Sequence, residues 1–273
     1  LKHDNAKILD KVAIAEERLV RRKHPYAFPS LSIKYCMDYF ELSSLDDLDL
    51  IVTDYSQFRR WNRSSESYNA TEFDYLRKNL SIKDEKVRFV NHHLAHASNA
   101  FYPSPHEEAA ILVVDGVGSN LETTSFFYGK NGKIRLVEKS RFFGIGYLYN
   151  SITNYVLNLG GIGGEGKTMG LAPFGQAHGR VLDFGGEYSG ACVDYSDFMR
   201  RLPASNILAT KSKYDTSPFL EKIDVCTNKK DLLSPYFSRI AYDLQEEAER
   251  ACIHLAKELY EKTGSKNLCV SGG

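Results

Sequence analysis

The sequence predicts a mixed α/β protein, and three observations carry that prediction. Residues 109–115 (AAILVVD) are apolar until the final aspartate, as in a strand that is buried on both faces. Apolar residues recur at helical spacing between residues 240 and 259, with lysines and glutamates on the opposite side. Strand patterns also alternate with helical ones, which favours sheets covered by helices. At 273 residues the chain is long enough for two lobes with separate cores.

The first part of the chain is predicted to follow this alternation. Residues 12–15 (VAIA) predict the end of a strand, and the charged segment 16–24 predicts a polar turn. Pro25 and Pro29 delay any helix until Ser30, where helical spacing of apolar residues begins. Two short strands are predicted after that helix, over residues 48–52 and 87–90.

A helix is predicted directly after the second of these strands, over residues 91–102. Asn91 is a good N-cap residue, and Pro103 ends the helix. The Pro-Ser-Pro sequence at 103–105 is the predicted join between a first lobe, residues 1–105, and a second lobe, residues 106–273.

The second lobe is predicted to open with three strands and to close with a long helix and a strand. Asn131-Gly132 predicts a hairpin turn between strands at 123–128 and 133–139. Residues 185–235 have no clear period, so we expect an irregular insertion that shapes a substrate site. The long helix is predicted to stop at Gly264, and a short strand is predicted at 268–270.

Composition excludes several functions. Lysine plus arginine and aspartate plus glutamate each number 35, so the chain lacks the basic excess that nucleic-acid binding needs. It has no apolar run of membrane-spanning length and no signal peptide at its start, and its five cysteines form no C-x-x-C pair. We therefore expect a cytoplasmic protein with no nucleic-acid or membrane partner, no disulfide framework and no zinc ribbon.

Two histidines and an aspartate form the first candidate site. His92 and His96 are four residues apart, so a helix presents both imidazoles on one face, while His93 points elsewhere. Asp115 ends a buried strand, where α/β folds place ligands. This set suits iron(II), manganese or zinc better than calcium or magnesium. The alternative is that the histidines satisfy local hydrogen bonds and that Asp115 belongs to an Asp-Gly turn.

A glycine-rich segment is the second candidate site. Residues 161–168 (GIGGEGKT) match the P-loop pattern G-x-x-x-x-G-K-[ST]. We reject a P-loop here because residues 169–175 (MGLAPFG) place two glycines and a proline where its helix should run. We expect an irregular loop whose backbone N–H groups, with Lys167, hold an anion. A flexible surface turn is the alternative structure, and a P-loop NTPase is an alternative function.

Several segments together resemble one family, the O-carbamoyltransferases that modify nodulation factors and antibiotics. They are spread over nearly the whole chain, and the histidine and GEGK segments are rather specific to this family. The matching segments are HD at 3–4, EERLVRRKH at 16–24, NHHLAHA at 91–97, AFYPSP at 100–105, VVDG at 113–116, GEGKTMGLAPFG at 164–175 and SGG at 271–273.

The resemblance implies a two-lobed actin-like fold of the ASKHA, ribonuclease H-like type, with the second lobe incomplete at its C-terminus. In the family, a separate C-terminal domain makes carbamoyl-adenylate from carbamoyl phosphate and ATP. The actin-like domain then transfers the carbamoyl group to a hydroxyl of a small molecule or glycoside. The expected partners are therefore this alcohol acceptor and the C-terminal domain, without which the chain is expected to be inactive.

The resemblance also implies residue roles. His92, His96 and Asp115 match metal ligands, with Fe²⁺ expected first and Mn²⁺ or Zn²⁺ as alternatives, and a further aspartate ligand would lie beyond residue 273. Asp115 is also matched to catalysis, together with Lys23 and His24, which fall in a segment near the acyl-adenylate. The residues matched to nucleotide or carbamoyl-adenylate binding are His3, Asp4, Gly164, Glu165, Gly166, Lys167, Gly170, Gly272 and Gly273.

Some assignments stay open after the resemblance. No general base for the acceptor hydroxyl is identified, although Asp194 and Asp215 are candidates. A non-catalytic, actin-like nucleotide-binding scaffold is a rival function, but a pure scaffold has no use for metal-ligand histidines. Threonylcarbamoyl transfer to tRNA is disfavoured by the balanced charge.

Overall fold

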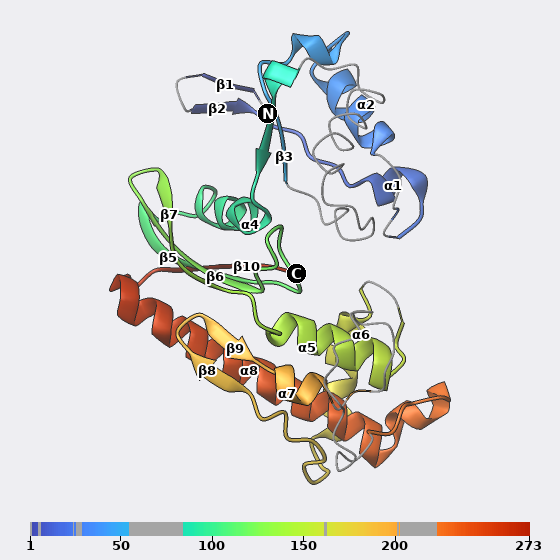
Figure 1. Cartoon of the computed structure of the whole chain (residues 1–273). Helices are drawn as coiled ribbons and strands as arrows, with labels where there is room; N and C mark the ends of the chain where they lie inside the picture. The colour runs from blue at the N-terminus through green and yellow to red at the C-terminus, as the bar shows by residue number, and fades with distance from the viewer. Residues whose placement is uncertain are drawn as a thin grey trace. The chain divides into compact units, whose positions relative to one another are not determined.

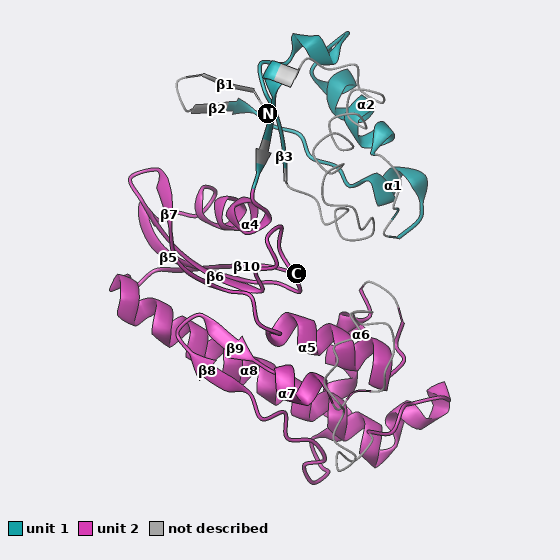
Figure 2. Cartoon of the chain, in the orientation of Figure 1, with its two compact units in different colours: residues 1–90 teal, residues 91–273 magenta. Residues whose placement is uncertain are grey.

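The chain forms two compact units, Leu1–Val90 and Asn91–Gly273 (Figure 2). The computed structural model describes residues 2–4, 7–23, 25, 29–54, 84–160, 163–200, 202 and 223–273. The division lies before helix α4 (His92–Phe101), whereas the sequence predicted it after that helix, at 103–105. The reason is packing: Ala97 and Phe101 of α4 belong to a hydrophobic cluster with strand residues of the second unit.

The described residues of the first unit form two pairs of strands and two helices (Figure 1). Its strands are β1 (Lys2–Asp4), β2 (Lys7–Asp10), β3 (Ile51–Asp54) and β4 (Val87–Val90). The first two pair antiparallel, and β3 pairs parallel with β4. Its helices are α1 (Glu16–Val20) and α2 (Ser30–Tyr39), and short 3₁₀ turns cover Leu45–Asp47 and Asp84–Lys86. The helix from Ser30 and the strand at 87–90 are thus confirmed.

Helix α1 corrects the polar turn predicted over residues 16–24. Its Glu16 carboxylate accepts hydrogen bonds from the backbone N–H and the hydroxyl of Ser32, at 2.7 and 2.6 Å. Two glutamates in the first turn also suit the positive end of a helix. The strand end predicted at 12–15 is also wrong, since β2 ends at Asp10. The strand predicted at 48–52 begins later, at Ile51.

A four-stranded sheet forms the centre of the second unit, in the order β10-β5-β6-β7. Its strands are β5 (Glu108–Val114), β6 (Thr124–Lys130), β7 (Lys133–Ser140) and β10 (Leu268–Ser271). The pairing of β10 with β5 is parallel and the other two pairings are antiparallel, so the sheet is mixed. The predicted hairpin is confirmed: Asn131 and Gly132 have φ of 50° and 69°, as a tight turn requires.

Helices cover both faces of this sheet (Figure 1). The described helices of this unit are α4, α5 (Ile145–Ser151), α6 (Glu165–Leu171), α7 (Ser196–Met199) and α8 (Pro235–Thr263). Helix α5 continues as a π-helical turn (Ile152–Val156), and α6 continues as a 3₁₀ turn (Ala172–Gly175). Another 3₁₀ turn (Lys229–Leu233) precedes α8. On one face Ile111 and Val113 of β5 pack with α4, and on the other Ala110 and Leu112 pack with α5 and α8. Strand β5 is therefore buried on both faces, which confirms the mixed α/β class.

The described residues within 185–235 are more regular than predicted. They contain the hairpin of β8 (Glu187–Ser189) and β9 (Cys192–Asp194), followed by α7. Val193, Tyr195 and Phe198 are buried in the hydrophobic core, so this part stabilises the unit through packing. Residue 201 and residues 203–222 of the predicted insertion lie outside the described residues.

Helix α8 is longer than predicted and ends as expected. Its buried side includes Ile240, Leu244, Leu255 and Leu259, which confirms the predicted apolar face. Gly264 ends the helix with φ of 67°. Within the described part of the chain, no helix combines the length and the apolar character needed to cross a membrane.

Candidate metal centre

Local structure at the start of α4 sets the positions of the two histidines. Asn91 has an extended backbone, and its Oδ1 accepts a hydrogen bond from the Leu94 N–H at 3.0 Å, as predicted for an N-cap. The helix therefore begins at His92 and presents His96 one turn later on the same face. The two rings lie with centroids 4.5 Å apart.

Asp115 reaches these histidines from the end of β5. Its Oδ1 accepts a hydrogen bond from the Gly116 N–H at 2.7 Å, and its own N–H donates to the carbonyl of Thr123 at 2.9 Å. Its Oδ2 lies 3.0 Å from His92 Nε2, which in turn lies 3.1 Å from His96 Nε2. One potential ligand atom from each of the three residues lies within 4.8 Å of the others. The three predicted ligands thus converge.

The arrangement fits a divalent transition metal. Asp115 Oδ2 is buried and has no hydrogen-bond partner within the described ranges, although His92 Nε2 is close. Zinc–nitrogen and zinc–oxygen bonds are about 2.0–2.2 Å long, so two ligand atoms at right angles around one ion stand about 3 Å apart. Two imidazole nitrogens and one carboxylate oxygen are also a donor set that such ions accept.

Electrostatics around the cluster favour ligand-competent protonation states. Burial raises the pKa of the Asp115 carboxyl, but the contact with His92 and the Gly116 hydrogen bond outweigh burial and hold this pKa below its usual value. His93 is fully buried and points away from the cluster, with Nδ1 2.8 Å from Ser125 Oγ. Burial lowers the pKa of His93 to about 4, so its imidazole adds no positive charge beside the cluster at neutral pH.

Sequence reasoning missed three residues that hold the ligands in place. Ser271 Oγ lies 3.2 Å from His96 Nδ1, and Ser119 Oγ accepts a hydrogen bond from the His92 N–H at 3.0 Å. Glu122 binds the Asn91 side chain, with Oε1 2.6 Å from Nδ2. Ser271 could have been suspected from the SGG segment, but nothing in the sequence pattern singles out Ser119 or Glu122.

The closing glycines lie beside the same end of the sheet. Gly272 has φ of 136°, and a Cβ there would overlap the carbonyl of Val114 at the end of β5. A Cβ on Gly273 would stand 3.8 Å from Asp115 Oδ1. The structure therefore brings the two glycines matched to nucleotide binding next to the metal-ligand cluster.

The glycine-rich segment corrects the prediction of an irregular loop. Residues 165–171 form helix α6, which follows Gly164 and contains Gly166 and Gly170, and residues 172–175 continue it as a 3₁₀ turn. Pro173 is accommodated because the start of a helical turn needs no N–H from that position.

The ground on which the sequence excluded a P-loop is therefore wrong, because a helix does follow the glycines, but a different feature argues against a P-loop. The described residues before the glycines form α5 and the π-helical turn, where a P-loop requires a strand. Lys167 Nζ donates to the carbonyl of Leu159 at 3.1 Å, and Glu165 Oε1 accepts from Asn150 Nδ2 at 2.6 Å.

Of the other residues with a predicted role, the structure describes the side chains of Lys23, in the first unit, and of Asp194, at the end of β9. Lys23 is exposed, and its Nζ lies 3.3 Å from Glu17 Oε1. His3 and Asp4 belong to β1, but their side chains lie outside what the structure describes, as do His24 and Asp215. Asp194 Oδ1 accepts hydrogen bonds from the N–H and the hydroxyl of Ser196. This carboxylate therefore already takes part in a local turn.

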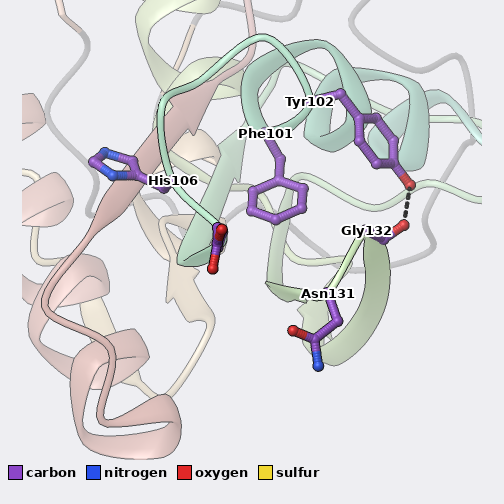
Figure 3. A pocket seen from close by; sticks show the side chains of 6 residues that line it. Phe101, Tyr102, His106, Asn131 and Gly132 are labelled. Carbon is purple, nitrogen blue, oxygen red and sulfur yellow. Dashed lines mark hydrogen bonds between the residues drawn. The ribbon is translucent and has the colours of Figure 1, made fainter. Parts of the chain in front are cut away.

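A pocket at the other end of α4 contains no predicted site residue. Figure 3 shows it between the end of the helix and the β6–β7 turn, where the Tyr102 hydroxyl donates to the carbonyl of Gly132 at 3.2 Å. Its lining residues are Phe101, Tyr102, His106, Glu107, Asn131 and Gly132. Since His92 begins α4 and Phe101 ends it, this pocket is separate from the metal-ligand cluster.

Fold and site together define a mixed α/β protein with a His–His–carboxylate cluster between the end of strand β5 and the start of helix α4. The family model for the carbamoyltransferase N-terminus matches residues 67–273. The chain belongs to the carbamoyltransferase family.

Curated relatives agree with this membership. The protein sll1178 of Synechocystis sp. is 30% identical over 321 residues, covering 99% of this chain and 49% of the relative. The nodulation protein NolNO of Sinorhizobium fredii is 29% identical over 300 residues, covering 99% of this chain and 40% of the relative. The nodulation protein NolO of Bradyrhizobium diazoefficiens is 26% identical over 194 residues, covering 67% of this chain and 31% of the relative. The chain spans half or less of the length of these relatives.

Proposed function

We propose that this chain carries the transfer site of a metal-dependent O-carbamoyltransferase, with carbamoyl-adenylate as donor and a hydroxyl of a small molecule or glycoside as acceptor. The observation that supports this proposal is the convergence of His92, His96 and Asp115 in a member of the carbamoyltransferase family. Fe²⁺ is the metal we expect first, and Mn²⁺ or Zn²⁺ fits the same ligands.

The chemistry is an acyl transfer. A bond forms between the acceptor oxygen and the carbamoyl carbon, and the bond from that carbon to the phosphate oxygen breaks. AMP leaves with the electron pair, and the acceptor hydroxyl gives its proton to a base. A bound divalent metal would supply positive charge that polarises a carbonyl or phosphate oxygen.

The residues around the site prepare the metal ligands for this role. In the tautomer that carries its proton on Nδ1, His96 donates to Ser271 Oγ and leaves the lone pair of Nε2 for a metal, in the manner of outer partners of metal-bound histidines. The Gly116 N–H holds Asp115 Oδ1, so that Oδ2 faces His92. Such preorganisation avoids the cost of rearranging the ligands when charge develops.

We assign the nucleotide to the side of the cluster where residues 271–273 end β10. The backbone of Gly272 approaches the end of β5 more closely than any side chain would permit, so the terminal glycines end beside Asp115. The roles of Gly164, Glu165, Gly166, Lys167 and Gly170, and those of His3, Asp4, Lys23 and His24, belong to the same proposal. They rest on the family resemblance.

The test incubates the protein at full length with Fe²⁺ under anaerobic conditions, carbamoyl phosphate, ATP and a panel of alcohols and glycosides. Mass spectrometry should detect an acceptor that has gained one carbamoyl group, together with AMP. His92→Gln, His96→Gln and Asp115→Asn should each abolish transfer. His106→Gln, at the other end of α4, is the matched control and should keep it.

Two outcomes would contradict the proposal. Binding of ATP without any carbamoylated product across the panel would favour the non-catalytic scaffold. Full transfer by all three ligand variants would show that the cluster is not the transfer site.

A further inference from the structure

Glu122 is a buried carboxylate in the loop between β5 and β6. Only 2% of its surface is exposed, and both of its oxygens accept hydrogen bonds. Oε1 lies 2.6 Å from Asn91 Nδ2, and Oε2 lies 2.5 Å from the Asn120 N–H. A charge buried to this extent is costly unless such donors satisfy it, so its position calls for an explanation.

These hydrogen bonds join the two segments that carry the metal ligands. Asn91 caps α4 through Oδ1 and binds Glu122 through Nδ2, so its side chain links the helix start to the loop. Within that loop, Ser119 accepts the His92 N–H, directly before the Asn120 amide that Glu122 binds. The residue after Glu122, Thr123, accepts the N–H of Asp115.

We propose that Glu122 is a positioning residue of the metal centre: its carboxylate fixes the start of α4 to the β5–β6 loop and thereby sets the distance between His92 and Asp115. This inference rests on the proposed metal site and extends it to a residue that contributes no ligand atom.

A purely structural role is the competing explanation. Glu122 also packs beneath the loop, where its Cγ would stand 3.1 Å from a Cβ on Gly118. Glu247 provides a matched control for such a role. It is 3% exposed in α8 and accepts hydrogen bonds from Tyr188, Tyr195 and Arg250. It is thus a buried, fully bonded carboxylate in the same unit that binds neither Asn91 nor the loop beside Asp115.

Side-chain chemistry supplies a rescue. In Glu122→Gln one of the two acceptor oxygens becomes an NH₂ donor. The glutamine side chain can therefore no longer accept one hydrogen bond from Asn91 Nδ2 and another from the Asn120 N–H on separate oxygens. In Asn91→Asp two carboxylates face each other without a donor between them. The double variant Asn91→Asp/Glu122→Gln reverses the direction of the hydrogen bond between the two side chains. The introduced carboxylate still accepts the Leu94 N–H and also accepts from the introduced amide, whose oxygen accepts the Asn120 N–H.

The experiment measures Co²⁺ affinity by competition with a chromophoric chelator, the visible absorption spectrum of the Co²⁺ complex, and the thermal unfolding of metal-free protein. Glu122→Gln and Asn91→Asp should each weaken Co²⁺ affinity about 10–100-fold, the usual effect of losing a group that orients metal ligands. The double variant should return both affinity and spectrum to near wild type. Glu247→Gln should lower the unfolding temperature and leave the Co²⁺ affinity and the spectrum of the Co²⁺ complex unchanged.

Asn91→Ser is a milder variant for the case in which Glu122→Gln does not fold. A serine keeps an N-cap acceptor but is too short to hold the Glu122 carboxylate in the same way, so affinity should fall as well. Wild-type affinity in Asn91→Ser and Glu122→Gln, or equal losses in Glu247→Gln, would overturn this inference alone. Absence of saturable Co²⁺ binding by the wild type would overturn the proposed metal centre and this inference with it.

Discussion

Asp115 Oδ2 and His92 Nε2 face each other across 3.0 Å, which joins the end of β5 to the first residue of α4. The helix and the strand are consecutive elements of the second unit, and the hydrogen bonds of Ser119 and Glu122 hold the loop beside this contact. The fold itself therefore brings these side-chain atoms together. In the proposed metal site, such preorganisation makes the expected metal affinity sensitive to single atoms of this cluster.

Replacing Asp115 with asparagine tests that sensitivity. The neutral amide removes a negatively charged ligand but keeps the shape of the side chain, so we expect Co²⁺ affinity to fall more than about 100-fold, beyond the usual loss for an outer partner. Isothermal titration calorimetry measures this change. Asp194→Asn, at a turn carboxylate of the same unit, is the control, and an equal loss there would refute the assignment of Asp115 as a ligand.

Ser271→Ala should weaken metal binding through His96. The variant removes the hydroxyl 3.2 Å from Nδ1, which fixes the ring orientation and the position of its proton, so affinity should drop about 10-fold or more. Ser265→Ala is a suitable comparison, because the Ser265 hydroxyl binds the carbonyl of Asn267 before the same strand. If both variants bind Co²⁺ like the wild type, Ser271 has no role in orienting His96.

Alanine at two glycines should change stability in opposite directions. Gly170 lies within α6, and a Cβ there would meet open space, so Gly170→Ala should stabilise the protein by about 0.5–1 kcal/mol through the helix propensity of alanine. Gly272→Ala should destabilise it, because a Cβ would overlap the carbonyl of Val114. Urea unfolding measures both changes, and a destabilised Gly170→Ala would argue against the helix over 165–171.

Alkaline pH should destabilise the second unit through ionisation of Tyr149. Burial, with the charge of Glu165, raises the pKa of Tyr149 to about 12, above the value of about 10 for an unfolded tyrosine. Above pH ~10 the unfolded chain therefore loses the Tyr149 proton first, so the free energy of unfolding falls as pH rises to about 12. Tyr149→Phe should make this fall shallower in urea titrations. An unchanged slope would show that Tyr149 ionises alike in both states.

Lys167→Ala should separate the two half-reactions proposed for the enzyme. The ammonium lies in the first turn of α6 and donates to the carbonyl of Leu159. In the full-length protein we expect weaker carbamoyl transfer with carbamoyl-adenylate formation largely intact, whereas a P-loop enzyme would lose all ATP consumption. Separate assays of carbamoyl-adenylate and carbamoylated product distinguish these results.

The predictable parts of the fold are those in which one periodicity extends over a whole element. The apolar run at 109–115 predicted a buried strand, and the long amphipathic pattern at 240–259 predicted a helix. Both predictions are confirmed, by β5 and α8. Helices α1 and α6 were missed because local composition misled. Charged residues in α1 suggested a turn, and the glycines of α6 suggested a loop, although a glycine inside a helix costs only about 1 kcal/mol.

The candidate site divides in the same way. His92 and His96 follow from helical spacing, and Asp115 follows from its place after a buried strand. Glu122 carries no such signal, because its partner Asn91 lies in another element and their contact exists only once helix and loop are packed. Residues that orient ligands are therefore the part of a site that sequence patterns reveal least.

The contact between His96 and Ser271 spans 175 positions of the chain, whereas His92 and His96 lie in α4 and Asp115 directly follows β5, the next element. During synthesis the three ligands can therefore meet early, but β10 pairs with β5 only after nearly all of the second unit has emerged from the ribosome. Non-local strand pairing of this kind forms slowly. On these principles, the contact of Ser271 with His96 is expected to be the last one made by the cluster, after the two histidines and Asp115 have come together.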